Sequence, residues 1–252
     1  MKKLLSIVLT LVMIFGVFAC VPFSASALAK RYDSGDYSYT LKNGKATLRR
    51  YEGKGKKIFK IPSKLDGYPV VKIGVCAFEG IDFETVIIPE GVTTIDAAFY
   101  WCEALKTVKI PKSVTNITSR FSQDCDNVAN IEVDKDNAYY CDVDGVLFNK
   151  DKTKLIEYPP KKKDKAYNIP NGIERICLHA FENSTSLENV TIPDSVKTIG
   201  KRAFWNSSIK SIKMSKNITR IGAEAFNGTK YWKNLDNWKN HGLYIDNYFS
   251  QI

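Results

Sequence analysis

Residues 169–191 read IPNGIERICLHAFENSTSLENVT, and residues 192–213 read IPDSVKTIGKRAFWNSSIKSIK. The two stretches are consecutive copies of one pattern. Ile-Pro is followed by spaced aliphatic residues, then by Ala-Phe, and then by two further aliphatic positions. These apolar positions stay constant, whereas the residues between them change freely among polar and charged types. A period of 22 or 23 residues predicts a solenoid whose turns bury their apolar sides against one another.

The Ile-Pro phrase also marks the N-terminal half. Copies begin at Ile61, Ile88 and Ile110, and a degenerate copy begins at Met214. Polar and apolar residues alternate before each phrase, which predicts a short strand that the proline ends. We expect the glycine of the recurring Ile-Gly pair to permit an unusual backbone torsion. Ala-Phe is expected on a short helical segment, so strands lie on one face and turns with short helical segments on the other.

The repeated phrase LxxVxIPxxVxxIxxxAFxxCxxL resembles the BspA-like leucine-rich repeats of bacterial surface proteins, also called the Treponema pallidum type. The resemblance covers the chain from Tyr37 to the C-terminus. It implies a leucine-rich-repeat-like solenoid, a bacterial source and adhesion or protein binding at the cell surface. It also implies that the segment DGVLFNKDKTKLIEYP (144–159) is architecture between blocks of repeats.

Residues 1–27 have the pattern of a secretory signal peptide. Lys2-Lys3 precedes an apolar run, and Ala25-Ser26-Ala27 forms a small-residue cleavage site. No later apolar stretch has the roughly 20 residues that a transmembrane helix needs. The protein is therefore expected to be secreted or held at the cell surface. Cys20 leaves an alternative open, in which this cysteine belongs to a lipoprotein signal and carries a lipid anchor.

The remaining chain divides into five segments. An Asn-Gly turn at Asn43 predicts a β-hairpin in the first of them, and an Asp-Gly turn at Asp144 predicts a β-meander in the third. The expected segments are an N-terminal β cap (28–60), repeat block 1 (61–133), an inserted β-meander (134–168), repeat block 2 (169–230) and an incomplete C-terminal β segment (231–252).

Charge favours some partners over others. The formal net charge is +10, or +8 without the two lysines of the leader. On an exported protein this excess favours acidic polymers or acidic proteins. No aromatic residues of the kind that stack on bases accompany the basic runs, so nucleic acid is not an expected partner.

No constellation of residues indicates catalysis. The two histidines, His179 and His241, stand in different repeats, and His179 is expected to be an exposed variable position. Cys102 and Cys125 occupy the same slot of adjacent repeats and are interpreted as buried thiols, with a disulfide between them as the alternative. The aspartates of 134–145 lack the spacing of a calcium loop. We therefore predict no enzyme, no cofactor and no metal ligand.

Strand periodicity nominates an outward-facing stripe, here called the lane, as the partner-binding site. Neighbouring strands lie about 4.8 Å apart, so outward residues of successive repeats form a continuous row. The lane consists of Thr85, Ile87, Thr107, Lys109, Asn130, Glu132, Asn189, Thr191, Ser211 and Lys213. Its expected partners are host or bacterial surface proteins or glycans, acidic ones among them. The alternative is a structural spacer within a larger surface protein, with no ligand of its own.

Overall fold

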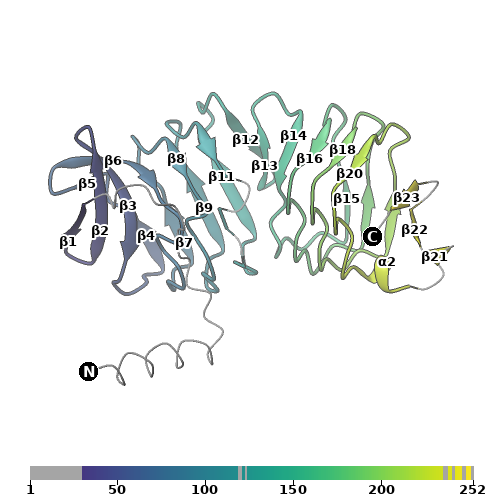
Figure 1. Ribbon diagram of the computed structural model, residues 1–252, viewed down its shortest axis with the longest axis horizontal. Coiled ribbons are helices and arrows are strands. Elements are labelled where there is room, and N and C mark those ends of the chain that lie inside the picture. Colours follow the sequence, from purple (N-terminus) through teal and green to yellow (C-terminus); the bar gives the residue numbers. More distant parts are fainter. Residues whose placement is uncertain are drawn as a thin grey trace, which may run out of the picture.

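The computed structural model describes residues 30–118, 121–122 and 124–234, together with the backbone of 238–239, 242–245 and 248–250. The expected signal peptide, Cys20 and His241 lie outside the described residues. Figure 1 shows an elongated stack of strands that runs from β1 at one end to β23 at the other. In the part of the chain described, no helix has the length and apolar character needed to cross a bilayer.

The predicted hairpin is confirmed at the N-terminal end. β2 (Tyr37–Lys42) and β3 (Lys45–Tyr51) pair antiparallel, and the turn between them uses positive φ angles of 52° at Asn43 and 68° at Gly44. β1 (Arg31–Ser34) pairs with the outer edge of β2. β3 then pairs parallel with the first repeat strand, so the hairpin covers the end of the solenoid.

Each repeat of block 1 contributes strands to two sheets. The first sheet holds the strands that lead into Ile-Pro, β4 (Ile58–Lys60), β7 (Thr85–Ile87) and β9 (Thr107–Ile110), and also β11 (Asn130–Val133), which Asp134 follows. The second holds β5 (Lys64–Leu65), β6 (Tyr68–Ile73), β8 (Thr94–Ile95) and β10 (Asn116–Ile117), continuous with the cap. This second row was not predicted, because the two-residue strands within it are too short to show an alternating pattern in the sequence.

The predicted meander follows block 1 (Figure 1). β12 (Tyr140–Val143), β13 (Val146–Asn149) and β14 (Lys154–Glu157) pair antiparallel in chain order. β14 then pairs parallel with the next repeat strand, so the meander is built into the solenoid.

Block 2 repeats the two-sheet arrangement. One sheet continues from β14 through β16 (Arg175–Ile176), β18 (Thr198–Ile199) and β20 (Arg220–Ile221). The other contains β15 (Ala166–Asn168), β17 (Asn189–Thr191) and β19 (Ser211–Lys213). The chain then forms α2 (Lys230–Lys233) and the antiparallel strands β21 (Trp238–Lys239), β22 (Gly242–Ile245) and β23 (Tyr248–Ser250).

Stacked phenylalanines fill the core between the two sheets. The rings of Phe181 and Phe204 lie 4.8 Å apart, and those of Phe204 and Phe226 lie 5.2 Å apart, both nearly parallel. Phe78 and Phe99 stack in the same way in block 1, at 5.6 Å. All these rings are buried, which confirms the repeat phenylalanine as the residue that joins one turn to the next.

The Ala-Phe segments are turns, where short helical segments were expected. The residue before Ala has a positive φ in several copies, including 60° at His179 and 53° at Arg202. This conformation interrupts a helix, and it directs the His179 N–H to the carbonyl of Lys201 in the following repeat.

The repeat glycine also differs from expectation. Gly200 does not have a positive φ, and a Cβ at this position would stand 2.5 Å from the backbone nitrogen of Leu178. The glycine is needed for close approach of the preceding turn, not for an unusual torsion.

Cys102 and Cys125 are buried thiols that form no disulfide. Cys102 Sγ donates to the carbonyl of Phe78 at 3.0 Å, and Cys125 Sγ donates to the carbonyl of Phe99 at 2.8 Å. Each thiol thus satisfies a carbonyl of the preceding turn while it fills an apolar slot, as the buried-thiol interpretation predicts. The hydrogen bond with the neighbouring Cys102, together with burial, raises the pKa of Cys125 far above its ordinary value.

Candidate functional site

The structure brings the N-terminal residues of the lane into register. Thr85, Thr107 and Asn130 are direct partners on neighbouring parallel strands, as are Ile87, Lys109 and Glu132. Between them lie buried residues such as Val86 and Val108. The lane residues of block 1 therefore form two parallel rows on the outer side of the β4–β7–β9–β11 sheet, and each of them is half-buried.

The C-terminal residues of the lane form equivalent rows in block 2. Asn189 pairs with Ser211, and Thr191 pairs with Lys213. The side chains of Asn189, Ser211 and Lys213 are exposed. These rows belong to the separate β15–β17–β19 sheet.

The lane is consequently split, where a continuous stripe was expected. Gly145, in the turn between β12 and β13, occupies the free edge of β11 and accepts a hydrogen bond from Ile131 N at 3.1 Å. Gly145 has a φ of 78°, and a Cβ there would lie 2.3 Å from Asn130 Oδ1. The turn of the meander therefore takes the position that the next rung of the lane would fill.

Charges within the lane are mutually neutralised in block 1. Lys109 Nζ lies 2.7 Å from Glu132 Oε2, and Asn130 Nδ2 donates to the other oxygen of Glu132 at 3.0 Å. A further pair flanks the lane, in which Lys106 holds the pKa of Glu84 below its usual value. The surface offers hydroxyl, amide and paired charged groups, which suits hydrogen bonding to a partner.

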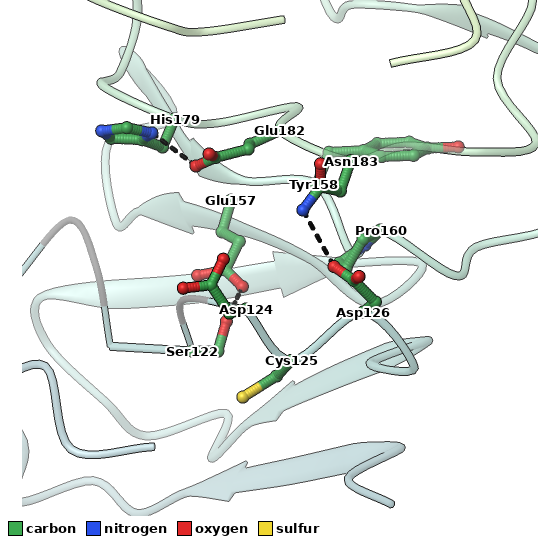
Figure 2. Close-up of a pocket in the computed structure, with 10 residues that line it drawn as sticks. All are labelled: Ser122, Asp124, Cys125, Asp126, Glu157, Tyr158, Pro160, His179, Glu182 and Asn183. Carbon is green, nitrogen blue, oxygen red and sulfur yellow. Dashed lines mark hydrogen bonds and ion pairs between the residues drawn. The ribbon is translucent and has the colours of Figure 1, made fainter. Parts of the chain in front are cut away.

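A small acidic pocket lies at the junction of the two blocks (Figure 2). Its residues come from three places: Ser122 from the last repeat of block 1, Glu157 from the end of β14, and His179 and Glu182 from the first repeat of block 2. The Ser122 hydroxyl donates to Glu157, and His179 pairs with Glu182. Burial, opposed by the Ser122 hydrogen bond and reinforced by the charge of Glu182, raises the pKa of Glu157 to about 7.

This pocket is small. Its volume is about 40 Å³, which accommodates a few water molecules. Across the described residues, no group of histidine, cysteine and carboxylate side chains has an arrangement that could hold a metal ion. The pocket is therefore a joint between the blocks, where Asn183 Nδ2 of block 2 donates to Asp126 Oδ1 of block 1 at 2.9 Å.

The interpretation of His179 as an exposed variable was wrong. Its side chain is only 7% exposed, and Glu182 covers it. The repeat alignment gave no signal of this, because the equivalent positions hold Arg202 and Glu224, which form an ion pair with each other.

Sequence reasoning also missed a structural asparagine in the aspartate-rich segment. Asn137 is fully buried and donates to the carbonyls of Pro111 and Val114 at 2.9 and 3.0 Å. Its Oδ1 accepts from the N–H groups of Tyr139 and Tyr140, both at 2.8 Å. The segment considered as a fragment of a calcium loop thus anchors the meander to block 1.

Comparison with known proteins gives a consistent result. The family model for the BspA type leucine rich repeat region matches residues 57–159 and 160–252, in six copies. No curated protein matches the sequence.

Several solved structures resemble the chain. A leucine-rich repeat protein from Eubacterium ventriosum is 17% identical with a TM-score of 0.52, and the match covers 78% of this chain and 94% of that one. A leucine rich cell surface protein from Faecalibacterium prausnitzii is 22% identical over 81% of each chain, with a TM-score of 0.48. A leucine-rich repeat protein from T. pallidum is 23% identical over 79% of this chain and 67% of that one, with a TM-score of 0.30. The Eubacterium ventriosum likeness shows the leucine-rich repeat fold.

Proposed function

This chain belongs to the BspA-type leucine-rich repeat family, and from that premise we propose that it is an exported protein that binds a partner protein through the lane. Proteins of this family are often found at the cell surface. The leader pattern of residues 1–27 and the Ala25-Ser26-Ala27 site support export.

The observation that carries the proposal is the register of the lane. Thr85, Thr107 and Asn130 stand in one row on strands held by a continuous core. Short side chains such as these lose little rotamer freedom when a partner covers them. Lys109 has a long side chain, but Glu132 already holds it at 2.7 Å, so part of its ordering cost is met before binding.

The rigidity of the scaffold supports the same function. Each lane strand is bonded to strands on one or both sides, and the phenylalanine stack joins the turns beneath it. A flat, preorganised surface of hydroxyl and amide groups favours a protein partner with a complementary polar surface.

The experiment introduces one bulky charged residue into matched positions of the two sheets. Thr107→Arg lies in the lane, and Thr94→Arg lies on β8 in the other sheet of block 1. Both threonines are half-buried, so the two changes carry similar folding costs. Binding of the purified mature protein is measured on surfaces coated with collagen-rich extracellular matrix and with mucin.

We expect saturable binding to at least one coat, a loss of about tenfold or more for Thr107→Arg, and an affinity within about twofold of the parent for Thr94→Arg. Equal loss in both variants would show that the lane is not the binding surface. Absence of saturable binding by the parent protein to either coat would favour the spacer function.

A further inference from the structure

A groove opens on the sheet opposite the lane, where block 1 meets the meander. The sheet of block 1 ends at β10, and the groove beyond it is lined by residues of β12, β13 and β14 and by Cys177, which directly follows β16. The groove has a volume of about 260 Å³, and its lining includes Ile117, Tyr139, Tyr140, Ile156 and Cys177. It exists because the repeat is interrupted, since an ordinary repeat would place another strand beside β10.

Two adjacent tyrosines, Tyr139 and Tyr140, line this groove. The Tyr140 hydroxyl accepts a hydrogen bond from Ile117 N at 2.9 Å, so it occupies the edge of β10 that a neighbouring strand would use. An extended peptide that adds to a sheet needs those backbone groups. Tyr139, in contrast, is 53% exposed and presents its ring to an incoming ligand. The groove therefore favours a ring-shaped ligand over an added peptide strand.

A row of basic residues begins at the groove and follows the sheet of block 2. Lys154, Arg175, Thr198 and Arg220 are register partners on β14, β16, β18 and β20. Neighbouring members stand about 4.8 Å apart. The three basic side chains are exposed, and none of them has an ion-pair partner among the residues that the structure describes.

The positive charge of this row extends into the groove. Burial raises the pKa of Cys177, and the charges of Arg175 and Lys154 oppose that increase. Lys154 itself lines the groove, as do the polar side chains of Thr115 and Asn149. The groove thus combines an apolar aromatic surface, hydrogen-bonding groups and cationic charge.

We propose that the groove and the basic row bind a polysaccharide whose sugar rings carry carboxylate groups. One sugar ring lies in the groove, with its apolar face against Tyr139 and its hydroxyl groups near Thr115 and Asn149. Further carboxylates pair with Arg175 and Arg220, whose planar guanidinium groups suit bidentate contacts to carboxylate. This site is independent of the lane, because it lies on the other sheet.

The test uses polygalacturonate as the probe, since it is a polymer of carboxylated sugar rings without sulfate. Its binding to the purified mature protein is measured by affinity electrophoresis at near-physiological salt, with neutral dextran as the reference polymer. Two groove variants are compared: Tyr139→Ala, and the double change Arg175→Glu with Arg220→Glu. The matched control is Lys60→Glu with Lys165→Glu, which reverses two exposed charges, one on β4 and one directly before β15, that belong neither to the lane nor to the groove.

We expect each groove variant to weaken polygalacturonate binding by about tenfold or more, and the control to remain within about twofold of the parent. Neutral dextran should not bind. A control that weakens binding as strongly as the arginine variant would show that overall charge is responsible and would overturn the proposal. So would an unaltered affinity in Tyr139→Ala, or polyglutamate binding as tight as polygalacturonate binding, because either result would mean that no sugar ring is recognised.

Discussion

Glu157→Gln is expected to stabilise the protein at alkaline pH and to leave its stability almost unchanged at acidic pH. Glu157 is partly buried at the junction pocket, where its pKa is raised from 4.5 to about 7, first by burial and then by the charge of Glu182. The Ser122 hydroxyl donates to its carboxylate and only partly offsets these effects. A glutamine retains an oxygen that can accept this hydrogen bond, but it carries no charge.

The direction of the stability change follows from the pKa values of Glu157 in the unfolded and in the folded chain. Below pH 4.5 the carboxyl is protonated in both the folded and the unfolded chain. Folding then buries no charge, so this group does not lower the free energy of unfolding. Between pH 4.5 and about 7 the unfolded chain ionises while the folded chain retains its proton, and stability falls. Above that range the free energy of unfolding stays lower by a constant amount. A pKa shift of this size corresponds to about 3 kcal/mol.

Urea unfolding of the parent and of Glu157→Gln at about pH 4 and about pH 8 measures this effect. We expect the free energies of unfolding to agree within about 0.5 kcal/mol at the lower pH, and the variant to be more stable by up to about 3 kcal/mol at the higher pH. Glu188→Gln is the control, because Lys210 holds the pKa of Glu188 below its usual value and the change should give no gain at pH 8. A difference for Glu157→Gln that is the same at both pH values would refute the reasoning.

Two further substitutions and one labelling experiment probe the core and the attachment of the meander to block 1. Phe204→Ala removes a fully buried ring from between two stacked neighbours, and it should cost about 3–5 kcal/mol in urea unfolding. Cys102 and Cys125 should resist maleimide in the native protein and react fully once it is denatured, whereas the half-buried Cys141 should react first, as counted by mass spectrometry. Asn137→Ala deprives two buried carbonyls and two N–H groups of their partner, and it should cost about 3 kcal/mol or more.

Matched controls separate these effects from the general cost of substitution. Ile58→Ala removes a side chain that is 59% exposed and should change stability by less than about 0.5 kcal/mol. Asn127→Ala removes one exposed hydrogen bond to the carbonyl of Glu103 and should be similarly mild. Losses as large as those of Phe204→Ala and Asn137→Ala would contradict the assignment of these residues as anchors. Native labelling of Cys102 at the rate of Cys141 would contradict its burial.

The apolar slots could be predicted from the sequence because burial repeats with the period of the chain. Ile173, Ile176, Ala180 and Phe181 keep the same environment as their counterparts one repeat later, so two aligned copies suffice to identify them. The second row of strands gave no comparable signal. Thr198-Ile199 becomes a strand through pairing with both neighbouring repeats, which is a property of the stack and not of the dipeptide.

The joint could not be predicted, because its contacts join residues that no repeat relates. Ser122 and Glu157 are 35 residues apart, and Asp126 and Asn183 are 57 apart. The role of Asn137 could not be predicted either. Its side-chain amide bonds to carbonyls 23 and 26 residues earlier, and the sequence around it looks the same as that of an asparagine in a solvated turn. Alignment of the repeats identifies the positions that stay constant from copy to copy. These residues act where the meander interrupts the repeats, so the alignment says nothing about them.

The inserted meander also explains where the surface of the solenoid departs from the regular pattern of the repeats. Within a block, each turn exposes the same repeat positions as the turn before it. Charged side chains on adjacent turns therefore stand side by side and form ion pairs, as in Lys109 with Glu132 and Lys210 with Glu188. The meander breaks this order on both sheets. On one sheet it places Gly145 where a rung of the lane would stand, and on the other it leaves β10 to be covered by the hydroxyl of Tyr140. A solenoid of identical turns would have neither the groove nor the split in the lane, so the insertion is what makes these two faces differ in shape and in the groups they expose.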